Sequence, residues 1–188
     1  MDRGKRHPLL ALAVLLGVLA GTRPEVTAAE ESSELRLAGR RAPVLSGQWL
    51  DGRPMRRADL DDKVVLVEFW TFDCINCRRT VPAMKRLHAL FAGGGDVVVV
   101  GVHTPETAHE RDPRAVRRAV ARLQLPYPVL LDPEMANWKA YDNHYWPALY
   151  VIDRRGTIRD LHIGELHEGT LAWRSLVTLI ERLRREPA

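Results

Sequence analysis

The stretch Trp70–Arg79 (WTFDCINCRR) decides the fold, because it contains both cysteines of the chain, spaced Cys-x-x-Cys. The run before it, Val64–Trp70 (VVLVEFW), is almost entirely apolar, which is typical of a strand that is covered on both faces. Apolar residues then recur at helical spacing from about Cys74 to Ala92. Cys74 is therefore expected at the start of a helix, where unpaired backbone N–H groups and the helix dipole stabilise the reactive thiolate.

The composition is that of an ordinary globular protein, with 188 residues, 46% hydrophobic and 28% charged. A chain of this length suits one domain with extensions. The formal net charge is +4 and the arginines are spread along the chain. Because no nucleic-acid-binding motif accompanies this charge, we expect a solvated basic surface and no nucleic-acid partner.

The N-terminus predicts a targeting segment over residues 1–28. Three basic residues precede the unbroken apolar run LLALAVLLGVLA at positions 9–20, which suits a signal-peptide core. Cleavage after Ala20 and cleavage after Ala28 both fit, and an uncleaved membrane anchor is the alternative. Residues 29–41 are expected to form a flexible lead-in. We therefore expect an exported domain, in a periplasm or a similar oxidising space.

Export changes how the two cysteines are interpreted. An even cysteine count in an exported protein usually indicates structural disulfides, but a bridge between residues three apart closes too small a loop to stabilise a fold much. A zinc site would need two further ligands at suitable spacing, and no second pair of that kind is present in the sequence. The pair is therefore predicted to be redox-active, with no cofactor and no metal.

The remaining segments predict an α/β fold for residues 42–188. The expected order begins with a hairpin around Asp51-Gly52 (residues 48–55). Helices then alternate with strands over 64–70, 96–102, 127–131 and 148–152. The chain ends with a strand over 157–163, antiparallel to the one before it, and a last helix from Thr170. Strands linked by helices are expected to be parallel. The result is a central mixed β-sheet flanked by helices on both faces, with an N-terminal β-hairpin extension.

Together these motifs resemble the thioredoxin superfamily: Trp-x-x-x-Cys-x-x-Cys between strand and helix, Pro82 in that helix, and Trp146-Pro147 before a late strand. The signal sequence and N-terminal hairpin resemble the exported TlpA-like (redoxin) branch. Residues 69–80, 101–106 and 143–148 are similar to the thioredoxin-like domain of DipZ-type proteins. Those proteins carry the domain on a multi-span membrane electron conduit, so we expect a separate membrane electron donor here.

The resemblance implies a fold, an activity and a set of site residues. Cys74 would be the nucleophile and Cys77 the resolving thiol, with a redox-active Cys74–Cys77 disulfide. Burial of a carboxylate in an apolar strand is energetically unfavourable, so Glu68 is expected to have a partner or a role. It lies at the position where the resemblance places a buried acid, the general base for the second cysteine. Pro147 would be cis beside Cys74, and Trp146, Pro147 and Trp70 would bind substrate.

The leading hypothesis is an exported thiol:disulfide oxidoreductase that reduces protein disulfides, with disulfide-bonded or thiol-bearing exported proteins as partners. A thiol peroxidase is one alternative, since Thr71-x-x-Cys74 is similar to the peroxiredoxin motif, although Val67 stands where those enzymes place a proline. A copper-binding thioredoxin-like chaperone is another, with His103 or His144 joining the cysteines.

Overall fold

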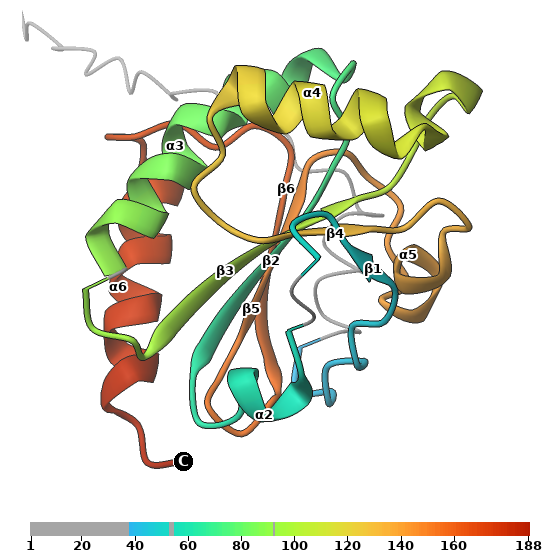
Figure 1. Ribbon diagram of the computed structural model, residues 1–188. Helices are drawn as coiled ribbons and strands as arrows, with labels where there is room; N and C mark the ends of the chain where they lie inside the picture. Colours follow the sequence, from blue (N-terminus) through green and yellow to red (C-terminus); the bar gives the residue numbers. More distant parts are fainter. Residues whose placement is uncertain (1–37, 53–54, 92) are drawn as a thin grey trace, which may run out of the picture.

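A six-stranded mixed sheet forms the centre of the protein (Figure 1), in the strand order β1-β4-β3-β2-β5-β6. A computed structural model describes residues 38–52, 55–91 and 93–188. The strands are β1 Gln48–Trp49, β2 Val64–Trp70, β3 Val97–His103, β4 Val129–Leu131, β5 Ala148–Ile152 and β6 Ile158–Ile163. The predicted α/β architecture is confirmed.

Helices cover both faces of this sheet (Figure 1). They are α2 Arg57–Leu60, α3 Ile75–Phe91, the 3-10 helix η1 Ala108–Arg111, α4 Pro113–Leu123, α5 Ala136–Ala140 and α6 Leu171–Arg185. Two predicted helix starts are confirmed, because the side chains of Asp112 and Thr170 accept hydrogen bonds from backbone N–H groups in the first turns of α4 and α6.

The alternation of β2 builds a separate core on each face. Val64 and Leu66 pack into the core shared with α3 and α6, whereas Val65 and Val67 pack into the core that includes Trp138 of α5. Each fully buried aliphatic side chain of this kind contributes roughly 1.5–3 kcal/mol to stability. The continuous apolar sequence of β2 is thus explained by burial on both sides.

The direction of β5 corrects one expectation. Strands β2, β3 and β4 are parallel, but β5 is antiparallel to β2, although a helix separates it from β4 along the chain. That helix, α5, has only five residues. Ala148, the first residue of β5, pairs with Phe69 near the carboxyl end of β2, so the connection returns to the edge of the sheet where β4 ends.

The first half of the predicted N-terminal hairpin pairs with the main sheet. Gln48 and Trp49 form β1, which pairs antiparallel with β4, while the turn after it is closed by a 3.1 Å hydrogen bond from the Gly52 N–H to the Trp49 carbonyl. Residues 53–54 lie outside the described part of the chain, and Met55 is not in a strand. β1 is therefore an edge strand of the main sheet.

The last residues of the expected lead-in are ordered. Gly39 donates a hydrogen bond to the carbonyl of Ile158, and Ile158 donates one back to Arg40, so this segment covers the edge strand β6. The predicted signal segment and the rest of the lead-in, up to residue 37, lie outside the described residues. Within the described residues, no helix is long and apolar enough to cross a bilayer.

Three parallel strands end at one edge of the sheet. Trp70, His103 and Leu131 are neighbours in register at the carboxyl ends of β2, β3 and β4. The loops that follow these strands, and the loop that precedes β5, therefore meet at this edge. The two cysteines lie in the first of these loops and in the helix that follows it.

Candidate active site

Cys74 lies at the N-terminal end of α3 and caps it. Its carbonyl accepts the Arg78 N–H at 3.1 Å, and its Sγ accepts the Cys77 N–H at 3.2 Å. The sulfur thus occupies the position in which a serine or aspartate oxygen usually caps a helix. A negative charge on this sulfur is stabilised by the same N–H group and by the helix dipole.

The two cysteines differ in access to solvent. Both are free, but Cys74 is half-buried whereas Cys77, one turn into α3, is 1% exposed. Burial in the first place, and then the hydrogen bond with Cys74, raise the pKa of the Cys77 thiol well above its usual value. An incoming disulfide can reach Cys74, and Cys77 needs a base to become a thiolate.

Glu68 is the buried acid on the strand before the cysteines. It is 2% exposed, and its Oε2 accepts a 3.1 Å hydrogen bond from the hydroxyl of Tyr127. Burial raises the pKa of Glu68 to about 8, and the hydrogen bond from Tyr127 opposes this shift. The charge of Glu68 in turn contributes to the raised pKa of Cys77, so the two groups are close enough to interact.

The peptide bond between Trp146 and Pro147 is cis, as the resemblance implies. The Trp146 carbonyl lies 3.9 Å from the Sγ of Cys74, and the indole N–H donates to the carbonyl of Thr104 at 3.0 Å. The indole ring also stacks on Trp138, with ring centroids 3.9 Å apart. These contacts hold the half-buried Trp146 beside the nucleophile.

Trp70 does not lie where the resemblance places a substrate-binding residue. It is 1% exposed and packs among Phe72, Cys77 and Val116, beneath the site. Alternation along β2 explains this position, because Trp70 is on the same face of the strand as the buried Glu68. Trp70 therefore supports the loop from below and offers no surface to a substrate in this structure.

A buried polar network anchors the loop just before Cys74. Glu110 is 1% exposed and uses one carboxylate oxygen to accept the hydroxyl of Thr71 and the N–H of Asp73, the latter at 3.2 Å. Its other oxygen accepts the N–H groups of Glu106 and Thr107 at 2.9 and 2.8 Å. One carboxylate thus holds both the cysteine loop and the loop that follows β3.

The direction of the hydrogen bonds in this network follows from the number of protons available. Burial acts to raise the pKa of Glu110, but the hydrogen bonds from Thr71, Thr107 and Asp73 outweigh it, so the pKa is lowered and the group is a carboxylate. Thr71 must donate its one hydroxyl proton to Glu110. The Nε2 of His103, 3.2 Å from that hydroxyl, must then be the donor to Thr71.

His103 is the neutral member of this network. It is 2% exposed and stacks on Phe72, with ring centroids 5.4 Å apart. Burial lowers the pKa of His103 to about 4, although the charge of Glu110 opposes that shift. The imidazole therefore contributes a fixed hydrogen-bond donor at neutral pH, and the only charge in the network is that of Glu110.

Replacing Thr71 by valine is expected to destabilise the protein by about 1–3 kcal/mol, because it leaves a buried imidazole N–H and a buried carboxylate oxygen without this partner. Thr71→Ser keeps the hydroxyl and should retain most of the stability. Denaturant unfolding of both variants at pH 7 measures the difference. Equal stability of the two variants would show that the hydroxyl has no role in holding the loop.

Two of these residues, Glu110 and Tyr127, were not identified from the sequence. Glu110 has a local signal, since Thr107-Ala108-His109-Glu110 fits the capping-box pattern and the structure shows such a box. That signal predicts a helix start but no link to Thr71. Tyr127 has no signal, because its contact with Glu68 joins residues 59 apart in the sequence.

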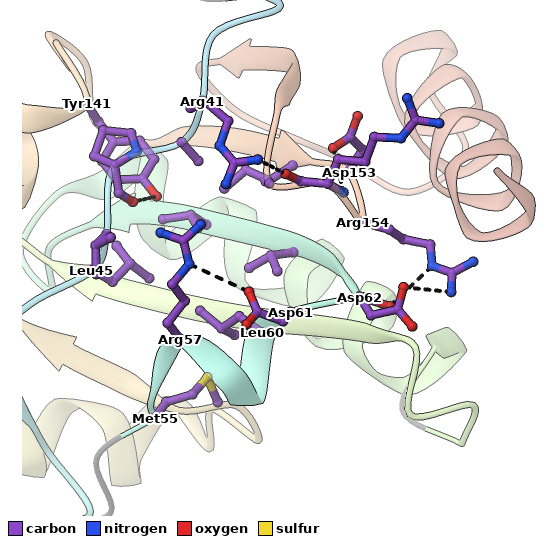
Figure 2. Close-up of a pocket in the computed structure, with 18 residues that line it drawn as sticks. Arg41, Leu45, Met55, Arg57, Leu60, Asp61, Asp62, Tyr141, Asp153 and Arg154 are labelled. Atoms are coloured by element: carbon purple, nitrogen blue, oxygen red, sulfur yellow. Dashed lines mark hydrogen bonds and ion pairs between the residues drawn. The ribbon is translucent and has the colours of Figure 1, made fainter. Parts of the chain in front are cut away.

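A separate pocket lies at the other end of β2 (Figure 2), with a volume of about 150 Å³. Its lining includes the buried Val65 and Ile152. Arg57 and Arg154 also line it, and they pair with Asp61 and Asp62. None of the predicted site residues lines it. It belongs to the opposite end of the sheet from the cysteines.

The sequence matches one protein-family model, and the structure superposes on solved thioredoxin-like proteins. Residues 38–161 match the AhpC/TSA family. Protein DipZ of Mycobacterium tuberculosis is 42% identical over 129 residues, which cover 66% of this chain and 18% of that protein. The thiol-disulfide oxidoreductase YkuV of Bacillus subtilis is 29% identical over 124 residues, covering 65% of this chain and 82% of that protein.

Among solved structures, a thiol-disulfide isomerase from Corynebacterium glutamicum superposes with a TM-score of 0.67 at 25% identity, covering 78% of this chain and 98% of that one. The predicted resemblance to thioredoxin-like proteins, including DipZ-type proteins, is thereby confirmed. The chain nevertheless spans less than a fifth of the length of the DipZ protein that it matches.

Proposed function

The chain belongs to the AhpC/TSA family of thioredoxin-like proteins, and from this premise we propose that it is an exported thiol:disulfide oxidoreductase that reduces protein disulfides. The observation that carries the proposal is the position of the Cys74 sulfur and its contacts. Its sulfur is half-buried at a helix N-terminus, accepts the Cys77 N–H, and lies beside the carbonyl of Trp146. This is the environment of a thiolate nucleophile that an extended substrate segment can reach.

The first chemical step is attack by the Cys74 thiolate on one sulfur of a substrate disulfide. The substrate S–S bond breaks, a mixed disulfide forms at Cys74, and the first substrate thiolate leaves and takes up a proton from solvent. The Trp146 carbonyl, before the cis-proline bond, is an acceptor for a backbone N–H group of the substrate, so that the peptide is held along this edge as an added strand.

The second step is attack by Cys77 on the Sγ of Cys74. Ionised Glu68 takes the proton of the Cys77 thiol, the mixed disulfide breaks, and the second substrate sulfur leaves as a thiolate that takes up a proton from solvent. The substrate gains two electrons and the Cys74–Cys77 pair becomes a disulfide. A further dithiol must then reduce this pair, and we propose a separate membrane-bound electron donor for that role.

The reductase direction predicts a low reduction potential. Ile75 and Asn76, between the cysteines, carry no charge that would stabilise the Cys74 thiolate strongly. We therefore expect a value closer to that of thioredoxin, about −270 mV, than to that of the strong oxidant DsbA, about −120 mV. Equilibration of the purified protein with glutathione buffers measures it. A potential near that of DsbA would contradict the reductase assignment and favour an oxidase.

Export is the second half of the proposal, and it rests on the basic and apolar pattern of residues 1–28. The partners proposed are exported proteins that carry disulfides or thiols. The N-terminal sequence of the protein isolated from its host distinguishes cleavage after Ala20, cleavage after Ala28 and an intact anchor.

Peroxide reduction is less well supported by the geometry. The Thr71 hydroxyl is engaged by Glu110 and His103, and no hydrogen bond links it to Cys74 within the described residues. Peroxide consumption, with Cys74→Ser as control, tests this alternative directly.

The copper-binding alternative relies on His103 or His144. His103 is hydrogen-bonded within the buried network, and exposed His144 lies 3.3 Å from Asp142. In the described ranges, no three His, Cys, Asp or Glu side chains are grouped as metal ligands. Copper(I) titration of the reduced protein, with and without each histidine, tests it.

A further inference from the structure

Glu68 lies next to Gly101 of the neighbouring strand β3, and the missing side chain at Gly101 leaves a space here called the slot. Its partners in register are Gly101 on β3 and Leu149 on β5, neither of which carries a charge. A Cβ atom at Gly101 would lie 2.9 Å from the indole nitrogen of Trp70 and 3.2 Å from Cε2 of Tyr127. Any larger residue at position 101 would therefore displace one of these rings.

Tyr127 enters this slot from the segment before β4. The Gly101 N–H donates to the carbonyl of Pro128 at 2.9 Å, which fixes the backbone next to Tyr127. The ring is 4% exposed, and its hydroxyl donates to Glu68 Oε2 at 3.1 Å. The position of the hydroxyl is thus set by the backbone of β3 and by the absence of a side chain at Gly101.

In the described part of the chain, few charged or titratable groups other than Tyr127 act on Glu68. From α3, Cys77 interacts with it, and His88 packs against the ring of Tyr127 with centroids 6.1 Å apart. The two adjoining strands contribute Gly101 and Leu149, as described above. Tyr127 is therefore the group placed to favour the ionised form of Glu68, since a hydroxyl that donates to a carboxylate stabilises its charge.

We propose that Tyr127 is a positioning residue for proton transfer from Cys77: its hydroxyl, held in the slot beside Gly101, orients Glu68 and favours the carboxylate form that accepts the proton. The transfer moves one proton from the Cys77 thiol to the Glu68 carboxylate and involves no electrons. The proposal rests on the proposed function, because it concerns the second step of that reaction. Tyr127 lies outside β2 and α3, the strand and the helix that carry Glu68 and Cys77.

The test is Tyr127→Phe in the full chain, which removes one oxygen and keeps the ring. Without the donor, the ionised form of Glu68 is less stable, so the titration of Glu68 should move to higher pH by about half to one unit. The infrared band of the protonated carboxyl, identified by its loss in Glu68→Gln, follows this titration. The rate of Cys77 attack on a preformed Cys74 mixed disulfide should rise with pH along a limb shifted in the same direction.

Tyr141→Phe is the matched control, because Tyr141 is also buried and its hydroxyl donates to the carbonyl of Pro43, away from the cysteines. It should leave both titrations unchanged. A shift in Tyr127→Phe no larger than in Tyr141→Phe would overturn the proposal. If the infrared shift is present but the parent protein reduces no disulfide, the positioning role stands and the proposed function fails.

Discussion

Replacing Cys74 with serine will reduce the rate of disulfide reduction by about three orders of magnitude or more, as the loss of a catalytic nucleophile does in other enzymes. A serine hydroxyl can still cap α3 by accepting the Cys77 N–H, so the fold should be preserved. It is not ionised at neutral pH and cannot form a disulfide. Turnover of a disulfide-bonded protein substrate under dithiol excess measures the loss.

Cys77→Ala should give a different result. The nucleophile remains, so the first step proceeds, but the mixed disulfide at Cys74 cannot be resolved within the chain. The variant should therefore accumulate covalently attached substrate, seen as a mass increase that a reductant reverses. Cys74→Ser is the matched control and should trap nothing. Trapping by Cys74→Ser, or no covalent substrate on Cys77→Ala, would contradict the assignment of Cys74 as nucleophile.

The signals that predicted the site are local ones. The apolar run, the cysteine spacing and the helical pattern after it place Cys74 at a helix start, and the capping signals at Asp112 and Thr170 act within a single turn. Glu68 stood out because a carboxylate in a buried strand needs a partner or a role. In each case the physical cause lies within a few residues of the signal.

The features missed depend on distant contacts. The carboxylate of Glu110 reaches Thr71 across 39 residues, and the two meet only because β2 and β3 end at the same edge of the sheet. The direction of β5 is set by its antiparallel pairing with β2, which is distant in the sequence. Trp70 was predicted to cover the active site, but it is buried beneath the cysteine loop by contacts with residues of α3 and α4.

The second large effect expected is that of Glu68 on the free energy of unfolding and on its dependence on pH. Burial raises the pKa of Glu68 to about 8 in the folded state, against 4.5 for an ordinary glutamate. Between these two pH values the folded chain keeps a proton that the unfolded chain has lost. Folding is therefore favoured by Glu68 in its protonated form below about pH 4.5, and this stability is lost as the pH rises toward 8.

Glu68→Gln removes this titration and keeps a side chain of similar shape with an oxygen that can accept from Tyr127. The variant should match the parent near pH 4.5 and become increasingly more stable as the pH rises to 8, by about 1.4 kcal/mol per pH unit and a few kcal/mol in all. Denaturant unfolding of the reduced proteins at several pH values measures the difference. Glu134→Gln, the same change at a side chain that is 85% exposed, controls for the substitution. A difference between parent and Glu68→Gln that does not grow with pH would show that burial does not raise the pKa of Glu68 in the folded protein.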